Sequence, residues 1–65
     1  MMADTRKLRA LMVEHDLTQA DVAKILGISE KTMHNRMKTG IFKTNEVEIL
    51  MNTLGIKDPM PIFFI

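Results

Sequence analysis

The chain has no cysteine, and this absence excludes several kinds of site. Without a thiol there is no disulfide, no thiolate nucleophile and no cysteine–zinc site, and the composition is compatible with a reducing cytoplasm. The two histidines, His15 and His34, belong to segments predicted to form different helices, and no HExxH pattern accompanies them. We therefore expect no metal ion and no cofactor.

Long apolar runs are also missing. No stretch approaches the roughly 18–20 residues of a membrane span, and we expect neither a membrane partner nor a signal peptide. A chain of 65 residues forms one domain at most, which buries only about 60% of its unfolded surface. Little room remains for an enzyme pocket, so we expect a single non-enzymatic domain over residues 1–65 with no small-molecule substrate. Aromatic residues are few, and seven methionines indicate a soft core.

A strong excess of positive charge is absent too. Nine basic and eight acidic side chains give a net charge of +1, which is weak evidence against nucleic-acid binding. The distribution is more informative than the sum. Four basic residues and no acidic one lie between Lys31 and Lys43. A charge run is usually only a solvated surface, but this one coincides with a predicted helix and the loop after it, which favours phosphate contacts.

Residues 18–38 contain start and stop signals for two short helices. Thr18 is a good N-cap, and Asp21 completes a capping-box-like pair with it, while Ser29 caps the second helix. Gly27 stands where the first helix must end in a left-handed residue. Two capped helices joined by so tight a turn predict a helix-turn-helix motif. Such a corner also occurs in other small α domains, but the free polar side of the second helix favours DNA binding.

Two further helices are predicted around this motif. The first is capped by Asp4 or Thr5 and runs to about Glu14 or His15, and the later one is capped by Thr44 and runs to about Leu54. Residues 1–3 are expected to be frayed. The last eight residues, 58–65, read DPMPIFFI and are not expected to form a helix interior. They are too apolar to be left in water without purpose, so we expect an extended tail. Ile62 and Phe63 are expected to pack on the core, whereas Phe64 and Ile65 are candidates for a dimer contact.

The second helix of the motif has two distinct sides. Met33 and Met37 lie about 40° apart on a helical wheel and define its buried side. On the other side, a lysine can donate to guanine and an asparagine can bond adenine bidentately. Glu30 lies toward the buried side, but in the first turn its side chain can point down a groove and accept from cytosine. Glu30 has an alternative role as an acid that complements the helix dipole. The candidates for reading DNA bases are Glu30, Lys31, Thr32, His34 and Asn35.

These residues resemble the phage Cro/repressor-type helix-turn-helix proteins. The resemblance covers about residues 4–56 and rests on Leu17-Thr18-Gln19, Val22-Ala23, Leu26-Gly27-Ile28-Ser29 and Met33 to Gly40. It implies an all-α fold of the lambda-repressor-like type, a compact bundle of four to five helices with the extended apolar C-terminal tail. It also implies that Gln19 contacts a DNA phosphate, as a helix N-terminus can. The phosphate candidates are Thr18, Gln19, Arg36, Lys38, Lys43 and Thr44, of which Arg36 and Lys38 can also complement the helix dipole.

The function that this resemblance implies is transcriptional regulation by sequence-specific binding to double-stranded operator DNA. A phage Cro-like repressor, or the DNA-binding domain of a phage repressor, would occupy the major groove as a homodimer, in the cytoplasm of a bacterial or phage-infected cell. The alternative is a protein–protein regulatory module, such as an antirepressor or antitoxin, on the same fold. A polar, basic outer side of the second motif helix favours DNA over a protein partner.

Overall fold

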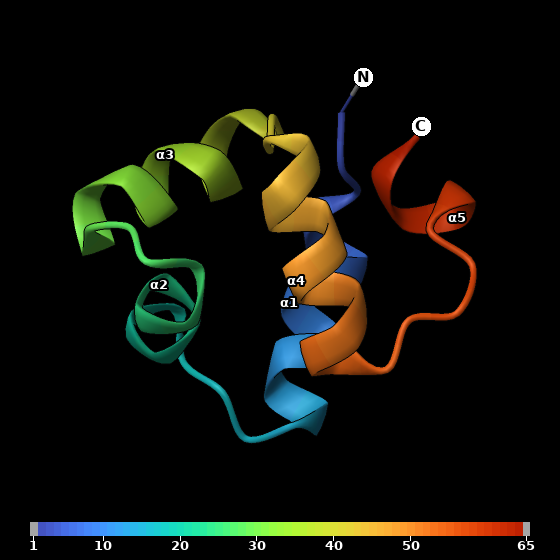
Figure 1. Ribbon diagram of the computed structural model, residues 1–65, viewed down its shortest axis with the longest axis horizontal. Coiled ribbons are helices and arrows are strands. Elements are labelled where there is room, and N and C mark those ends of the chain that lie inside the picture. Colours follow the sequence, from blue (N-terminus) through green and yellow to red (C-terminus); the bar gives the residue numbers. More distant parts are fainter. Residues whose placement is uncertain (1, 65) are drawn as a thin grey trace.

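The computed structural model describes residues 2–64, and within that range the chain forms five α-helices and no β-strand (Figure 1). The helices are α1 (Thr5–Glu14), α2 (Gln19–Leu26), α3 (Glu30–Thr39), α4 (Thr44–Leu54) and α5 (Met60–Phe63). Figure 1 shows α1 and α4 in the centre, α2 and α3 on one side and α5 on the other. The predicted all-α, lambda-repressor-like class is confirmed.

The predicted helix signals of the motif are present in atomic detail. The Thr18 hydroxyl accepts the Asp21 amide at 3.1 Å, and the Asp21 carboxylate accepts the Thr18 amide at 2.9 Å, which forms the complete capping box. Ser29 accepts the Thr32 amide at 3.1 Å at the start of α3. Gly27 ends α2 in the left-handed conformation with φ +71°. Local capping therefore determines both ends of the turn between α2 and α3.

The prediction that Thr44 caps α4 is wrong by one residue. Lys43 is the N-cap, and Thr44 is the first helical residue. The carboxylate of Glu46 reaches back to accept the Lys43 amide at 2.9 Å. This contact requires an acid three residues after the N-cap, whereas a cap at Thr44 would have placed Val47 there.

The core lies between the helices and is built from side chains on all five. The packing is closest between α2 and α3, and α2 also packs on α4 while α1 packs on α5. Leu8, Val22, Met33 and Leu50 are fully enclosed. The other buried apolar residues are Ala3, Met12, Ala23, Leu26, Met37, Leu54 and Phe63.

The C-terminal tail is not extended as predicted. Residues 60–63 form the short helix α5, whose first amide donates to the Asp58 carboxylate at 3.1 Å. Prolines 59 and 61 flank its first residue, where a missing N–H removes no intrahelical hydrogen bond. Two prolines in eight residues therefore permit one helical turn, although they would prevent a longer helix.

The apolar side chains of the tail are of two kinds, as predicted: some pack on the core and others do not. Phe63 is buried and meets Phe42 edge to face with ring centroids 6.2 Å apart, and Ile62 is half-buried against the core. Phe64 is exposed, and Ile65 lies outside the described residues. The core contacts of Ile62 and Phe63 are confirmed, whereas the dimer contact of Phe64 and Ile65 stays a prediction.

The segment before α1 ties the ends of the chain together. Ala3 was expected to be frayed but is buried, and its amide donates to the Gly40 carbonyl at 2.6 Å. The amide of Asp4 donates to the Ile62 carbonyl at 2.5 Å, so the N-terminal segment bridges the end of α3 and α5 (Figure 1). Gly40 has φ +74°, and a Cβ there would lie 2.9 Å from the Ala3 carbonyl oxygen. Only glycine satisfies both the backbone angle and this contact.

Gly40→Ala should therefore destabilise the fold more than Gly27→Ala. The two glycines end helices at nearly the same angle, φ +74° and +71°, but a Cβ at Gly27 would meet nothing within 4 Å. We expect a loss of about 1–2 kcal/mol for Gly27→Ala and about 2–4 kcal/mol for Gly40→Ala, where a backbone collision adds to the left-handed strain. Urea unfolding at equilibrium measures both. Equal losses would show that the contact with Ala3 contributes nothing.

Candidate nucleic-acid interface

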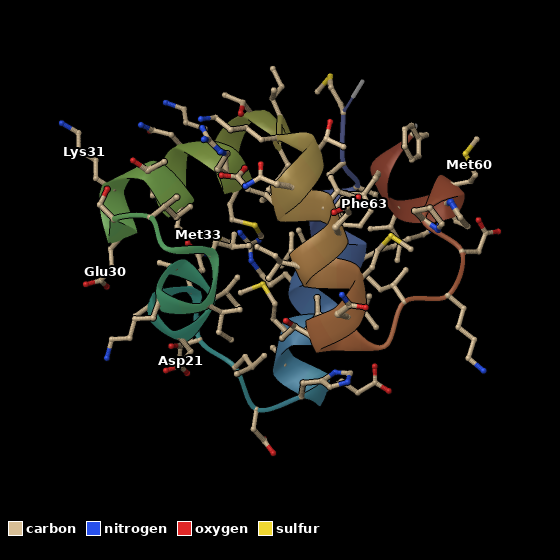
Figure 2. All side chains as sticks on the ribbon, in the orientation of Figure 1. Asp21, Glu30, Lys31, Met33, Met60 and Phe63 are labelled. Atoms are coloured by element: carbon tan, nitrogen blue, oxygen red, sulfur yellow. The ribbon has the colours of Figure 1, made fainter. Side chains whose placement is uncertain are left out.

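Helix α3 presents one buried and one exposed side, as the helical wheel predicts. Met33 and Met37 are buried, whereas Lys31, His34, Asn35 and Lys38 are exposed. Figure 2 shows Met33 directed into the molecule, while Glu30 and Lys31 project from the first turn of α3. The outer side of α3 is thus a row of polar side chains, and its apolar inner side packs on the core.

Four of the five base-reading candidates are exposed, namely Glu30, Lys31, His34 and Asn35, but Glu30 projects from the first turn of α3 in a different direction from Lys31 (Figure 2). Thr32 differs, because it is half-buried and its hydroxyl accepts a hydrogen bond from the Ser29 hydroxyl at 2.9 Å. The Thr32 side chain therefore supports the start of α3. Its predicted contact with a base stays a prediction, as do those of the other four.

The phosphate candidates lie at helix ends. Thr18 and Gln19 stand at the start of α2, where the Thr18 hydroxyl is engaged in the capping box and Gln19 is half-buried. Lys38 lies in the last turn of α3, and Lys43 and Thr44 lie at the start of α4. The last three are exposed. The loop of residues 40–43 therefore connects the last turn of α3, which carries Lys38, to the start of α4, which carries Lys43 and Thr44.

Arg36 is engaged inside the protein. Its Nε donates to Oε1 of Glu46 at 2.9 Å, and its Nη2 donates to Oε2 at 3.3 Å. The side chain of Glu46 is only 3% exposed and that of Arg36 is 22% exposed. Among the described residues, Glu46 is the one buried charged residue, and every buried polar side-chain atom there has a partner. This ion pair joins α3 to α4.

The family comparison agrees with this geometry. Residues 7–59 match the family described as Cro/C1-type HTH DNA-binding domain. The chain belongs to this family. The match takes in α2, α3 and α4 entirely and most of α1, so the resemblance identified from the sequence is confirmed. No curated protein and no solved structure matches the chain.

Members of the Cro/C1-type family are DNA-binding domains by description, and other kinds of site find no support in the part of the chain that the structure describes. There, no three His, Asp or Glu side chains are grouped to hold a metal ion, and no pocket is detected. Over residues 2–64, no helix is long and apolar enough to cross a membrane. The exposed polar side of α3 is therefore the candidate surface for a DNA contact.

The Arg36–Glu46 pair was not predicted from the sequence of this Cro/C1-type domain. The sequence pattern indicates Arg36 as a phosphate or helix-dipole residue, and it indicates no partner for Glu46. One local signal was available, because an acid three residues after an N-cap often bonds back to the cap amide. The ion pair itself spans ten positions, and it depends on how α3 and α4 pack.

The surroundings of Glu46 keep it ionised. Burial acts to raise the pKa of this carboxyl group, but hydrogen bonds from the Arg36 guanidinium and the Lys43 amide, together with the positive charge of both residues, outweigh it. The pKa of Glu46 therefore lies below its ordinary value of 4.5. The pKa of Asp21 is also lowered, chiefly by hydrogen bonds with Thr18.

Glu46→Gln should lower stability at neutral pH and change its dependence on acid. Gln can still accept from Lys43 but leaves the guanidinium without its charged partner, so we expect a loss of about 1–3 kcal/mol at pH 7. Because the folded pKa of Glu46 is depressed, its charge-dependent contribution is fully present above the ordinary value of 4.5. It is lost as the pH falls through the lower folded value.

Urea unfolding of wild type and Glu46→Gln between pH 7 and about pH 2.5 tests this linkage. The difference in unfolding free energy between the two proteins should narrow as the solution becomes acidic. Asp21 is present in both proteins, so its own linkage cancels in the comparison. A difference that stays constant over the whole range would contradict a charge-dependent role for Glu46.

Proposed function

We propose that this Cro/C1-type domain is a sequence-specific transcriptional regulator, a phage Cro-like repressor or the DNA-binding domain of a phage repressor. In this proposal residues 1–65 form one helix-turn-helix domain that occupies an operator in the cytoplasm and blocks polymerase without catalysing a reaction. The observation that carries the proposal is the outer side of α3, where Lys31, His34 and Asn35 are exposed opposite the buried Met33, with Glu30 exposed at the first turn.

The dimensions and chemistry of α3 support insertion into the major groove. An α-helix with its side chains is about 10–12 Å wide, and the groove is about 12 Å wide. Lys31 can donate to guanine, Asn35 can pair with adenine, and Glu30 can accept from cytosine. Thr18, Gln19, Arg36, Lys38, Lys43 and Thr44 are the proposed phosphate contacts on either side of the groove.

A homodimer on DNA is part of the proposal. Four exposed apolar side chains, Met2, Ile41, Met60 and Phe64, belong to segments at or next to the backbone bonds Ala3–Gly40 and Asp4–Ile62. Figure 2 shows Met60 directed outward from α5. Apolar side chains gathered at one end support contact with a second copy, which would present a second α3 about 34 Å away along the duplex.

The alternative is a protein–protein regulatory module, an antirepressor or antitoxin, and the same exposed apolar residues are the observation that favours it. The polar outer side of α3 favours DNA instead, because an interface core for a protein partner is depleted of charged residues. Binding experiments on this helix separate the two functions.

Asn35→Ala and Lys43→Ala should affect DNA binding in different ways. Asn35→Ala should cost about 1–3 kcal/mol on the preferred operator and relax selectivity at one base pair. Lys43→Ala should weaken binding to all sequences alike and lower the slope of log affinity against log salt by about one unit. Binding to a duplex selected from a random pool and to its scrambled version, over a salt series, measures both effects.

The selected duplex itself is informative, since a palindromic winner indicates two symmetric half-sites. If Asn35→Ala weakens binding to the selected and the scrambled duplex equally, α3 does not read sequence. The protein-partner alternative then becomes the better explanation of the exposed residues.

Phe64→Ser should weaken self-association with little effect on the fold. The Phe64 side chain is exposed in the isolated chain, so its removal leaves the core intact, unlike a deletion that includes buried Phe63. We expect the dimer dissociation constant to rise about tenfold or more. Val13→Ser is the matched control, because Val13 is also an exposed apolar residue but lies on α1. Sedimentation with and without DNA measures this, and a wild-type chain that stays monomeric in both conditions rules out the homodimer.

A further inference from the structure

Glu46 is an unexpected residue at this place in a DNA-binding domain. It brings a negative charge to the junction of α3 and α4, next to residues proposed to meet phosphates. A buried carboxylate also loses hydration, and an apolar side chain of similar size at such a place is often no less stable. The stability of the fold is therefore a weak reason for an acid at position 46.

The contacts of Glu46 suggest a different reason. One of its carboxylate oxygens accepts from both Arg36 Nε and the Lys43 amide, each at 2.9 Å, and the other accepts from Arg36 Nη2 at 3.3 Å. Arg36 follows the base-reading candidate Asn35 directly on α3, and Lys43 is the phosphate candidate at the start of α4. A single buried carboxylate therefore binds the side chain of the residue that follows one predicted DNA contact, Asn35, and the backbone amide of another, Lys43.

Other contacts at this junction involve the backbone of α3 and of the residue after it: the Thr39 hydroxyl donates to the Asn35 carbonyl at 2.9 Å, and the Gly40 carbonyl accepts the Ala3 amide. The loop between α3 and α4 passes through Gly40, and within the loop the Ile41 amide donates to the Thr39 hydroxyl at 3.3 Å, a bond at the α3 side only. The planar guanidinium of Arg36, bound through two nitrogens, resists rotation more than a single contact would. Glu46 is thus placed to set the distance between the exposed side of α3 and the Lys43 cation.

We propose that Glu46 is a positioning residue for DNA binding, whose carboxylate holds Arg36 and the Lys43 backbone so that α3 and Lys43 engage one duplex together. This inference rests on the proposed function. It differs from a purely structural role, in which Glu46 would raise thermal stability but a folded variant would bind DNA as well as the wild type does.

The test compares Glu46→Gln with Glu48→Gln. Each variant removes one negative charge from α4, so each changes the net charge equally, but Glu48 is exposed. Loss of a negative charge by itself should leave DNA affinity unchanged or raise it slightly. The positioning role predicts the opposite sign for Glu46→Gln, a loss of about five- to tenfold on the duplex selected by the wild type, with a smaller ratio of selected to scrambled affinity.

Binding is measured at a temperature at which circular dichroism shows each protein to be fully folded. If folded Glu46→Gln binds the selected duplex as tightly as Glu48→Gln does, the positioning role is wrong while the proposed function stands. If the wild type itself does not distinguish selected from scrambled DNA, the proposed function fails, and the positioning role falls with it.

A second variant, Arg36→Lys, keeps the test decisive if Glu46→Gln is not folded at any usable temperature. Arg36→Lys retains the positive charge but replaces the fork of two hydrogen bonds with a single ammonium contact. The positioning role predicts a smaller ratio of selected to scrambled affinity for this variant at unchanged net charge. A selectivity ratio equal to that of the wild type would overturn it.

Discussion

The placement of α3 depends on the burial of Met33 and Met37, because these are the only buried side chains that this helix contributes within the described structure. A ten-residue helix with so polar a composition would not persist alone in water. Burying two methionine side chains contributes about 1.5–3 kcal/mol each, and most of that offsets ordering of the helix. The other eight residues of α3 contribute no buried side chain to the core.

Because only two side chains of α3 are buried in the core, the contacts at the ends of this helix are important. Ser29 caps the first turn, and the left-handed Gly40 ends the helix in contact with Ala3. The Arg36–Glu46 ion pair fastens the C-terminal half of α3 to α4. Each of these contacts involves a polar group or a glycine, so the helix is held in place without apolar residues on the side proposed to meet DNA. The same contacts place the proposed phosphate contacts beside the base-reading surface.

Acidic and basic side chains near α3 differ in burial as well as in their position along the chain. The net charge is only +1, and of the two acids that flank the basic segment, Glu46 is enclosed and paired with Arg36, whereas Glu30 is exposed. Lys31, Lys38 and Lys43 remain exposed. A weak overall charge gives little long-range attraction to DNA, so the proposed affinity depends on a few contacts at short range. The precise placement of those contacts then matters more than it would in a strongly basic protein.

The sequence by itself determined the helices and their boundaries wherever the signal was local. The Thr18–Asp21 capping box, the Ser29 cap and Gly27 act across three or four positions, so each could be predicted from neighbouring residues. The periodic burial of Met33 and Met37, and the exposure of Lys31 and Asn35, followed from the geometry of one helix.

Only the tertiary structure decided the contacts between distant segments. Three features depend on which elements lie side by side. They are the burial of Glu46 with Arg36, the contact of Ala3 with Gly40, and the helical turn of residues 60–63. The start of α4 at Lys43 rather than Thr44 is different, because Glu46 bonds back to the Lys43 amide over only three positions, which is a local signal. An isolated polar side chain has water as an equally good partner, so its sequence position does not reveal its role. Burial removes the water, and the partner that remains is the one that packing provides.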